Sequence, residues 1–191
     1  NYKKIKTTLI LCMMRDSTFE ENKKIIDLAH FYNLPIDLAG AEALYKTENF
    51  KDLFMYANKL GVKYTIHAGE ADGIESIKSA VSFGAKRIGH GVRIIDDIDN
   101  IDFVKGTTFE VCPKSNIDTK AFLEYKNHPI RKMYDKGLLV TISTDNNTVS
   151  NITLTEEYEN LARTFNFKEE DFFKMNMNAI NAAFITETEK E

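Results

Sequence analysis

Six short runs of apolar and β-branched residues alternate with amphipathic helical segments along the 191-residue chain, and this alternation predicts an α/β fold. Strands joined by helices in this way pair in parallel. Residues 12–15 (Cys-Met-Met-Arg), which end the first run, lack the glycines of a phosphate-binding loop, and this favours a barrel over an open doubly wound sheet. We therefore expect one domain over residues 1–191: a partial (β/α)8 barrel with about six of the eight strands and additional C-terminal helices.

The first three strands are separated by helices with recognisable start and stop signals. Ser17 and Glu20 have the spacing of a capping box for a helix that runs to about residue 30, and Pro35 prevents its continuation. Apolar residues at i, i+3, i+4 and i+7 spacing predict a second helix over residues 50–60, which Gly61 ends. The three strands are expected at residues 7–13, 36–39 and 63–67.

The second half of the chain repeats this alternation. Helices are expected at residues 74–84, 98–104 and 130–136. Strands are expected at residues 87–90, 107–112 and 138–143. Two closing helices follow, the first capped by Thr153 with Glu156 and the second by Asn166 with Glu169.

Composition excludes several classes of function. The formal charge is −4 with basic residues dispersed among acids, so we expect no nucleic-acid partner. No apolar run approaches the ~20 residues of a membrane-spanning helix, so we expect no membrane partner. Cys12 and Cys112 lack Cys-x-x-Cys spacing and lie in strand-like runs, which predicts buried free thiols in a reducing compartment, the cytoplasm.

Three of the predicted strands end in residues that can bind a metal or move a proton. His67 and Glu70 belong to the run His-Ala-Gly-Glu, His90 lies between two glycines, and Asp145 with Asn146 follows the sixth strand. A neutral imidazole can bind zinc, and a carboxyl beside a metal can transfer a proton. Since the active sites of (β/α) barrels are built at the carboxyl ends of the strands, these residues are expected to meet in one site.

Each of these motifs also has a structural interpretation. Backbone groups can satisfy a histidine at a strand end, and Glu70 can be a helix-start carboxylate favoured by the helix dipole. Asp-Asn-Asn after a strand is ordinary turn chemistry. The coincidence of three motifs at one end of the sheet favours a common site. His30 and His128, at predicted helix ends, are assigned to structure.

These residues give the chain a resemblance to the adenosine deaminase family of the metal-dependent amidohydrolases, and to its bacterial members in particular. The matching segments are Ile-Asp-Leu-Ala-Gly-Ala-Glu at residues 36–42, Thr-Ile-His-Ala-Gly-Glu at 65–70, Arg-Ile-Gly-His-Gly at 87–91, Glu-Val-Cys-Pro-Lys-Ser-Asn at 110–116, Ser-Thr-Asp-Asn at 143–146 and Asn-Ala-x-x-Ala-Ala-Phe ending at 184. The resemblance covers nearly the whole chain. It implies hydrolysis of adenosine or 2′-deoxyadenosine, a small-molecule purine nucleoside, to inosine and ammonia by zinc-activated hydroxide.

The resemblance also implies a role for individual residues. His67 and Asp145 match zinc ligands, and Glu70 matches the acid that protonates purine N1. His90 matches the histidine that orients the attacking hydroxide. Gly40 matches the residue whose backbone amide meets purine N3.

Some features depart from the family pattern. Asn146 stands where many members have an aspartate facing purine N7, and because an amide donates without protonation, activity is expected to survive with altered pH behaviour. Ala41 replaces a common acidic residue. The family's His-x-His pair, which supplies two further zinc ligands, occurs nowhere in this sequence. We therefore expect an absent N-terminal part with two strands, an unpaired strand edge on each side of the gap, and an isolated chain that is nearly inactive.

Two alternative functions stay open at this stage. One is deamination of adenine or a modified purine, because the ribose contacts of the family lie mostly outside this sequence. The other is a non-catalytic, purine-binding remnant of the barrel. The zinc site of cytidine deaminases is disfavoured, because the Pro-Cys-x-x-Cys signature is absent.

Overall fold

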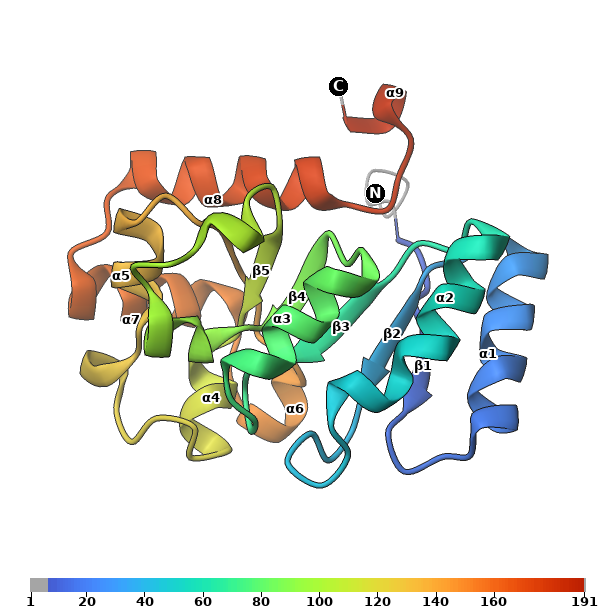
Figure 1. Cartoon of the computed structure of the whole chain (residues 1–191). Helices are drawn as coiled ribbons and strands as arrows, with labels where there is room; N and C mark the ends of the chain where they lie inside the picture. The colour runs from blue at the N-terminus through green and yellow to red at the C-terminus, as the bar shows by residue number, and fades with distance from the viewer. Residues whose placement is uncertain (1–6, 191) are drawn as a thin grey trace.

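The computed structural model describes residues 7–190, in which six parallel strands lie side by side with helices packed around them (Figure 1). The strands are β1 (Leu11–Met14), β2 (Ile36–Ala39), β3 (Thr65–Ala68), β4 (Arg87–His90), β5 (Thr108–Val111) and β6 (Leu139–Ile142). The helices are α1 (Phe19–Tyr32), α2 (Lys51–Leu60), α3 (Ile74–Phe83), α4 (Pro113–Asp118), α5 (Ile130–Asp135), α6 (Asn147–Ser150), α7 (Leu154–Phe165), α8 (Glu169–Ala182) and α9 (Glu187–Lys190). Short 3-10 turns are η2 (Thr47–Phe50), η3 (Val92–Asp97), η4 (Asp102–Val104) and η5 (Tyr125–Asn127).

The strands follow one another in space in the order of the sequence. Strands β1 and β2 form one parallel pair, and β3 to β6 form a four-stranded parallel sheet. A single bridge between Ile36 and Tyr64 joins the two sheets. Within residues 7–190, β1 pairs only with β2 and β6 only with β5. This arrangement confirms the predicted partial barrel.

Most element boundaries agree with the sequence-based expectation, but the first two do not. The strand expected over residues 7–13 begins only at Leu11. The capping box of α1 is formed by Thr18 and Glu21, one residue later than expected: the Glu21 amide donates to the Thr18 hydroxyl, and the Thr18 amide donates to the Glu21 carboxylate. Ser17 and Glu20 share the same residue types and spacing, so sequence alone does not separate the two registers.

Further along, the helix expected over residues 98–104 is wrong: η3 ends before this range, and within it the structure has only the 3-10 turn η4. The apolar residues of the segment are spaced by three, the period of a 3-10 helix, rather than by the 3.6 of an α-helix. The Thr153–Glu156 capping box of α7 is confirmed. Asn166 instead ends α7 in a left-handed conformation, and α8 begins after Lys168, whose amide donates to Asp171. The short helices α4 and α6 were not predicted.

The core lies between the sheet and the surrounding helices. Ile66, Ile88, Phe109 and Val140 are in register across β3 to β6, and all four are fully buried. Of the two cysteines expected to be buried, Cys112 is buried but Cys12 is exposed, since it alternates with the buried Met13 along β1. None of the helices within the described range is long and apolar enough to cross a membrane.

Replacement of Phe109 tests how far the stability of the chain depends on the four buried residues that are in register across β3 to β6. Phe109→Ala removes a fully buried ring, so we expect the free energy of unfolding to fall by about 3–5 kcal/mol. Urea titration followed by circular dichroism measures this loss. Phe31→Ala is the matched control, because Phe31 is 78% exposed and its loss is expected to change stability by no more than about 0.5 kcal/mol. Equal effects of the two substitutions would contradict this description of the core.

Candidate active site

One face of the four-stranded sheet carries the polar residues. His67, Gly89, Glu110 and Thr141 are in register across β3 to β6, on the opposite face from the buried apolar row. The missing side chain at Gly89 leaves room for His67, because a Cβ there would lie 3.1 Å from the His67 Nδ1 atom. Glycine at this position therefore permits the close approach of the His67 ring.

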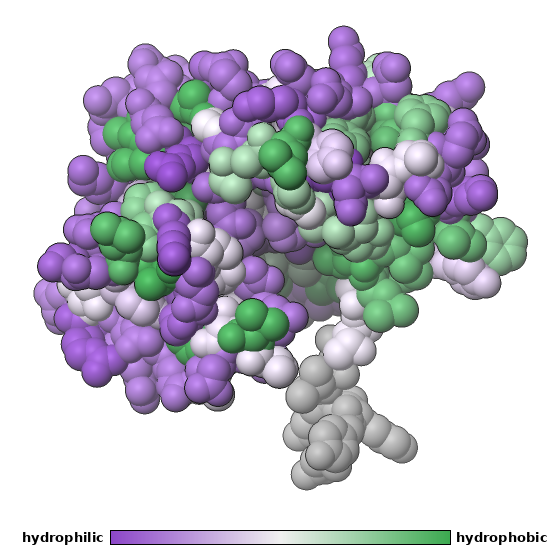
Figure 2. All heavy atoms as spheres, turned by 90° about the horizontal axis from the view of Figure 1, so that it is seen from below, coloured by the Kyte–Doolittle hydropathy of each residue, from purple (hydrophilic) through white to green (hydrophobic). Residues whose placement is uncertain are grey.

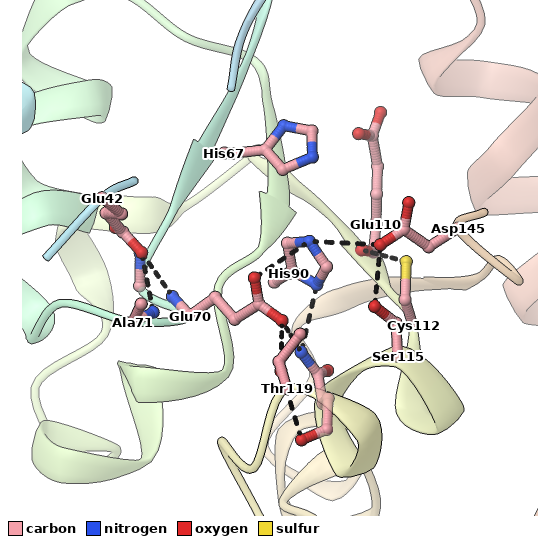
Figure 3. A network of polar contacts seen from close by, with 12 residues as sticks. Glu42, His67, Glu70, Ala71, His90, Glu110, Cys112, Ser115, Thr119 and Asp145 are labelled. Carbon is pink, nitrogen blue, oxygen red and sulfur yellow. Dashed lines mark hydrogen bonds and ion pairs between the residues drawn. The ribbon is translucent and has the colours of Figure 1, made fainter. Parts of the chain in front are cut away.

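His67 is held from its Nδ1 side. Both carboxylate oxygens of Asp37 lie within 3.1 Å of Nδ1, so Nε2 is directed into the space in front of the sheet (Figure 3). Burial by itself lowers the pKa of His67, but the hydrogen bond and charge of Asp37, with the charges of Asp145 and Glu110, outweigh this effect and raise it to about 9. A carboxylate on the far nitrogen is the usual support of a metal-binding histidine.

Glu70 is directed toward the same space by residues of α4. Its Oε1 atom accepts hydrogen bonds from the Asn116 amide at 2.8 Å and from the Thr119 hydroxyl at 2.9 Å. Its Oε2 atom lies 3.5 Å from His90 Nε2 (Figure 3). The carboxyl group is thereby fixed in orientation beside the imidazole.

His90 and Asp145 both have left-handed backbone conformations, with φ of 61° and 57°. Register pairs His90 with Ala68, on the helix-facing side of the sheet, so the positive φ at the strand end is needed to turn the ring toward Glu70. Non-glycine residues rarely adopt such a conformation, and those that do are found preferentially at functional sites.

His90 Nε2 lies 4.0 Å from Asp145 Oδ2, which also accepts a hydrogen bond from the Ser115 hydroxyl. Burial lowers the pKa of His90, and the charge of Glu70 opposes this effect.

Four of the five residues predicted to meet are thus brought together, whereas the fifth, Asn146, and the other predicted substrate contact, Gly40, lie at the margin. Gly40 follows β2 with φ of 107°, and a Cβ there would lie 3.3 Å from the Arg15 amide. Asn146 is exposed and accepts a hydrogen bond from the Val149 amide as the cap of α6. The purine contacts of Gly40 and Asn146 stay predictions.

Glu42 is a buried residue of the site to which sequence reasoning gave no role. Its carboxylate accepts hydrogen bonds from four consecutive backbone amides, at residues 69–72, and from the Ser76 hydroxyl. The fully buried Arg15 contributes its positive charge nearby and donates to the backbone oxygen of His67. Glu42 therefore fixes the loop that carries Glu70. Its position in the family-like segment 36–42 was the only sequence signal.

The donors for a metal are present only in part. His67 and Asp145 face one space (Figure 3), and imidazole and carboxylate are ligand types that zinc accepts. Among residues 7–190, no three His, Cys, Asp or Glu side chains are grouped so that they could hold a metal ion. Catalytic zinc usually has three protein ligands. The described residues therefore fit part of a zinc site without completing one.

The chain is similar to known proteins over nearly its whole length. A family model described as adenosine deaminase matches residues 3–191. The chain belongs to the adenosine deaminase family. The adenosine deaminase of Clostridium acetobutylicum is 43% identical over 189 residues, which cover 96% of this chain and 57% of that protein. The adenosine deaminase of Haemophilus ducreyi is 39% identical over 196 residues, covering 97% of this chain and 57% of that protein.

Solved structures of deaminases share the fold of this adenosine deaminase family member. An adenine deaminase from Arthrobacter aurescens superposes with a TM-score of 0.89 at 25% identity, over 96% of this chain and 58% of that one. The N6-methyl-AMP deaminase of Arabidopsis thaliana has a TM-score of 0.86 at 25% identity, over 96% of this chain and 56% of that one. An amidohydrolase from Burkholderia ambifaria with bound zinc has a TM-score of 0.86 at 24% identity, over 96% of this chain and 53% of that one. The chain spans little more than half the length of each of these proteins.

The carboxylate of Glu42 gives a direct test of how the site is held. Glu42→Gln places an NH2 group against backbone N–H donors, so we expect the free energy of unfolding to fall by about 2–3 kcal/mol and amide exchange at residues 69–72 to accelerate. Urea titration and hydrogen–deuterium exchange measure the two effects. Glu48→Gln, at an exposed position, is the control. Unchanged exchange at residues 69–72 would show that the loop does not depend on Glu42.

Proposed function

We propose that the whole protein deaminates adenosine and 2′-deoxyadenosine hydrolytically, releasing inosine or its deoxy form and ammonia. The observation that carries this proposal is the convergence of Glu70, His90 and Asp145 at the carboxyl ends of β3, β4 and β6, in a chain of the adenosine deaminase family. The free cysteines, which are typical of a reducing compartment, support an action in the cytoplasm.

A cavity next to these residues supports a small-molecule substrate. It has a volume of about 490 Å³ and is lined in part by His67, His90 and Asp145. This size is within the range of sites for small ligands. Figure 2 views the molecule from the side of the carboxyl ends of the strands and shows a hollow in the middle of this face.

The side chains support a defined path for protons and electrons. Glu70, in its protonated form, donates a proton to purine N1, which draws electron density from C6. The oxygen of a water molecule adds to C6, and one of its protons passes to the amino group, which leaves with the C6–N6 electron pair as ammonia. The second proton of this oxygen returns to the Glu70 carboxylate, so that C6 becomes a carbonyl and the acid is restored. His90 Nε2 and Asp145 lie 4.0 Å apart, where they can orient the attacking oxygen between them.

We infer that zinc is the cofactor, with His67 and Asp145 as two of its ligands. When bound, zinc lowers the pKa of a coordinated water to about 7. Because the described residues offer only part of a ligand set, the proposal requires additional ligands outside them. The support of His67 by Asp37 is consistent with a metal on Nε2.

Adenosine is favoured over adenine or a modified purine. The relatives at 39–43% identity are adenosine deaminases, whereas the structural neighbours that act on adenine and on N6-methyl-AMP are 25% identical. The presence together of Glu70, His90 and Asp145 favours catalysis over a non-catalytic purine-binding barrel.

Replacement of Glu70 tests the proposed reaction. Glu70→Gln retains the shape of the side chain but removes the transferable proton, so kcat for adenosine is expected to fall by roughly 10²–10⁴ with little change in KM. The conversion of adenosine to inosine by the whole protein is followed by ultraviolet absorbance. Glu75→Gln, on the surface of α3, is the control. Full activity of Glu70→Gln, or faster turnover of adenine than of adenosine by the unmodified protein, would overturn the assignment.

The metal is tested separately. Zinc content of the purified whole protein is expected to be close to one atom per chain and to fall at least about tenfold in His67→Ala. Elemental analysis measures both. His30→Ala, at the exposed end of α1, is expected to retain its zinc. Equal zinc content in the two variants would remove His67 from the ligand set.

A further inference from the structure

His128 is a buried histidine that the proposed reaction does not use. It precedes α5 and is 3% exposed. Its Nδ1 atom accepts a hydrogen bond from the backbone N–H of Ile130 at 3.2 Å. A backbone N–H can only donate, so Nδ1 carries the lone pair and the ring proton is on Nε2. Burial, with a smaller effect from His90, lowers the pKa of His128 to about 3, and the ring is therefore neutral near pH 7.

The orientation of Asn116 follows from this tautomer. His128 Nε2 lies 3.1 Å from Asn116 Oδ1, so the imidazole N–H donates to the amide oxygen. The NH2 group of Asn116, which is fully buried, must then face the opposite way, toward the candidate active site.

Both hydrogens of this NH2 group have acceptors. Asn116 Nδ2 lies 2.8 Å from Glu70 Oε1 and 3.1 Å from His90 Nδ1. Since Nδ2 can only donate, His90 Nδ1 is an acceptor, and the proton of the neutral His90 ring is on Nε2. That atom is the one near Glu70 Oε2 and Asp145 Oδ2, at 3.5 and 4.0 Å.

We propose that His128 and Asn116 are positioning residues that act as a relay, which fixes His90 in its Nε2–H tautomer and orients the carboxyl group of Glu70. The chain of donors runs from the Ile130 amide through His128 and Asn116 to His90 and Glu70. The inference rests on the proposed function, in which His90 donates from Nε2 to orient the attacking oxygen and Glu70 protonates the purine. The tautomer itself is defined without reference to catalysis.

The relay is tested by the ring nitrogens of His90 and His128. In the whole protein labelled with ¹⁵N-histidine, two-bond ¹H–¹⁵N correlation spectra distinguish a nitrogen that carries a proton from one that does not. We expect His90 and His128 both to carry the proton on Nε2 in the unmodified protein. The two buried rings are assigned by the loss of their signals in His90→Gln and His128→Gln, and the exposed His30, assigned with His30→Gln, serves as the reference. A proton on Nδ1 of either buried ring in the unmodified protein would overturn the relay.

Two substitutions then test the relay causally. Asn116→Asp replaces the NH2 donor by an acceptor, so the ring proton of His90 is expected to move to Nδ1 and kcat to fall at least about tenfold with a smaller change in KM. His128→Phe keeps an aromatic ring against Phe122 but removes the imidazole N–H that donates to Asn116. We expect a mixture of His90 tautomers in this variant. His128→Gln, which retains an N–H donor, is expected to recover part of the loss in kcat. An unchanged His90 tautomer in a folded Asn116→Asp or His128→Phe variant would contradict the proposal.

Failure of the relay and failure of the proposed function give different results. If the unmodified protein has the expected His90 tautomer but does not turn over adenosine, the proposed function is wrong and the relay stands. If it turns over adenosine with the ring proton of His90 on Nδ1, the relay is wrong and the proposed function stands.

Discussion

The loop that carries Glu70 depends on one interaction, with the buried carboxylate of Glu42. Four consecutive N–H groups between β3 and α3 converge on it, and the Ser76 hydroxyl adds a fifth donor. Burial of backbone N–H groups without an acceptor costs free energy, and so does burial of a carboxylate without donors. In this loop the carboxylate and the N–H groups satisfy one another. Glu70 leaves the loop in a fixed direction as a result.

A single short helix then orders the other side chains. Helix α4 directs Ser115 to Asp145 and Asn116 to Glu70, and Thr119, which caps its C-terminus, also donates to Glu70. Pro113 at its first turn favours this start, because proline has no N–H to leave unsatisfied there. The groups that meet the predicted catalytic residues thus come from an element too short to show a helical period in the sequence.

The sequence predicts the strands that carry the site better than the residues that support it. Strand ends at His67 and His90 are marked locally, by β-branched runs and flanking glycines, and the structure has them at or within one residue of the expected ends. Glu42 and Asn116 act across 27 and 46 residues of sequence, and local periodicity contains no information about such contacts. The sequence pattern also does not predict the positive φ angles of His90 and Asp145. The misplaced capping box of α1 is an error of register, and the helix expected over residues 98–104 is an error of period.

The central claim is that His67, Glu70, His90 and Asp145 form one zinc-dependent deaminase site. A crystal structure of the whole protein with zinc and a bound purine nucleoside, read with anomalous scattering at the zinc edge, tests it most directly. The account predicts a zinc ion about 2.0–2.2 Å from His67 Nε2 and from a carboxylate oxygen of Asp145, and a purine with N1 at hydrogen-bond distance from Glu70. Zinc bound elsewhere, or a purine whose C6 lies away from His90, would contradict it.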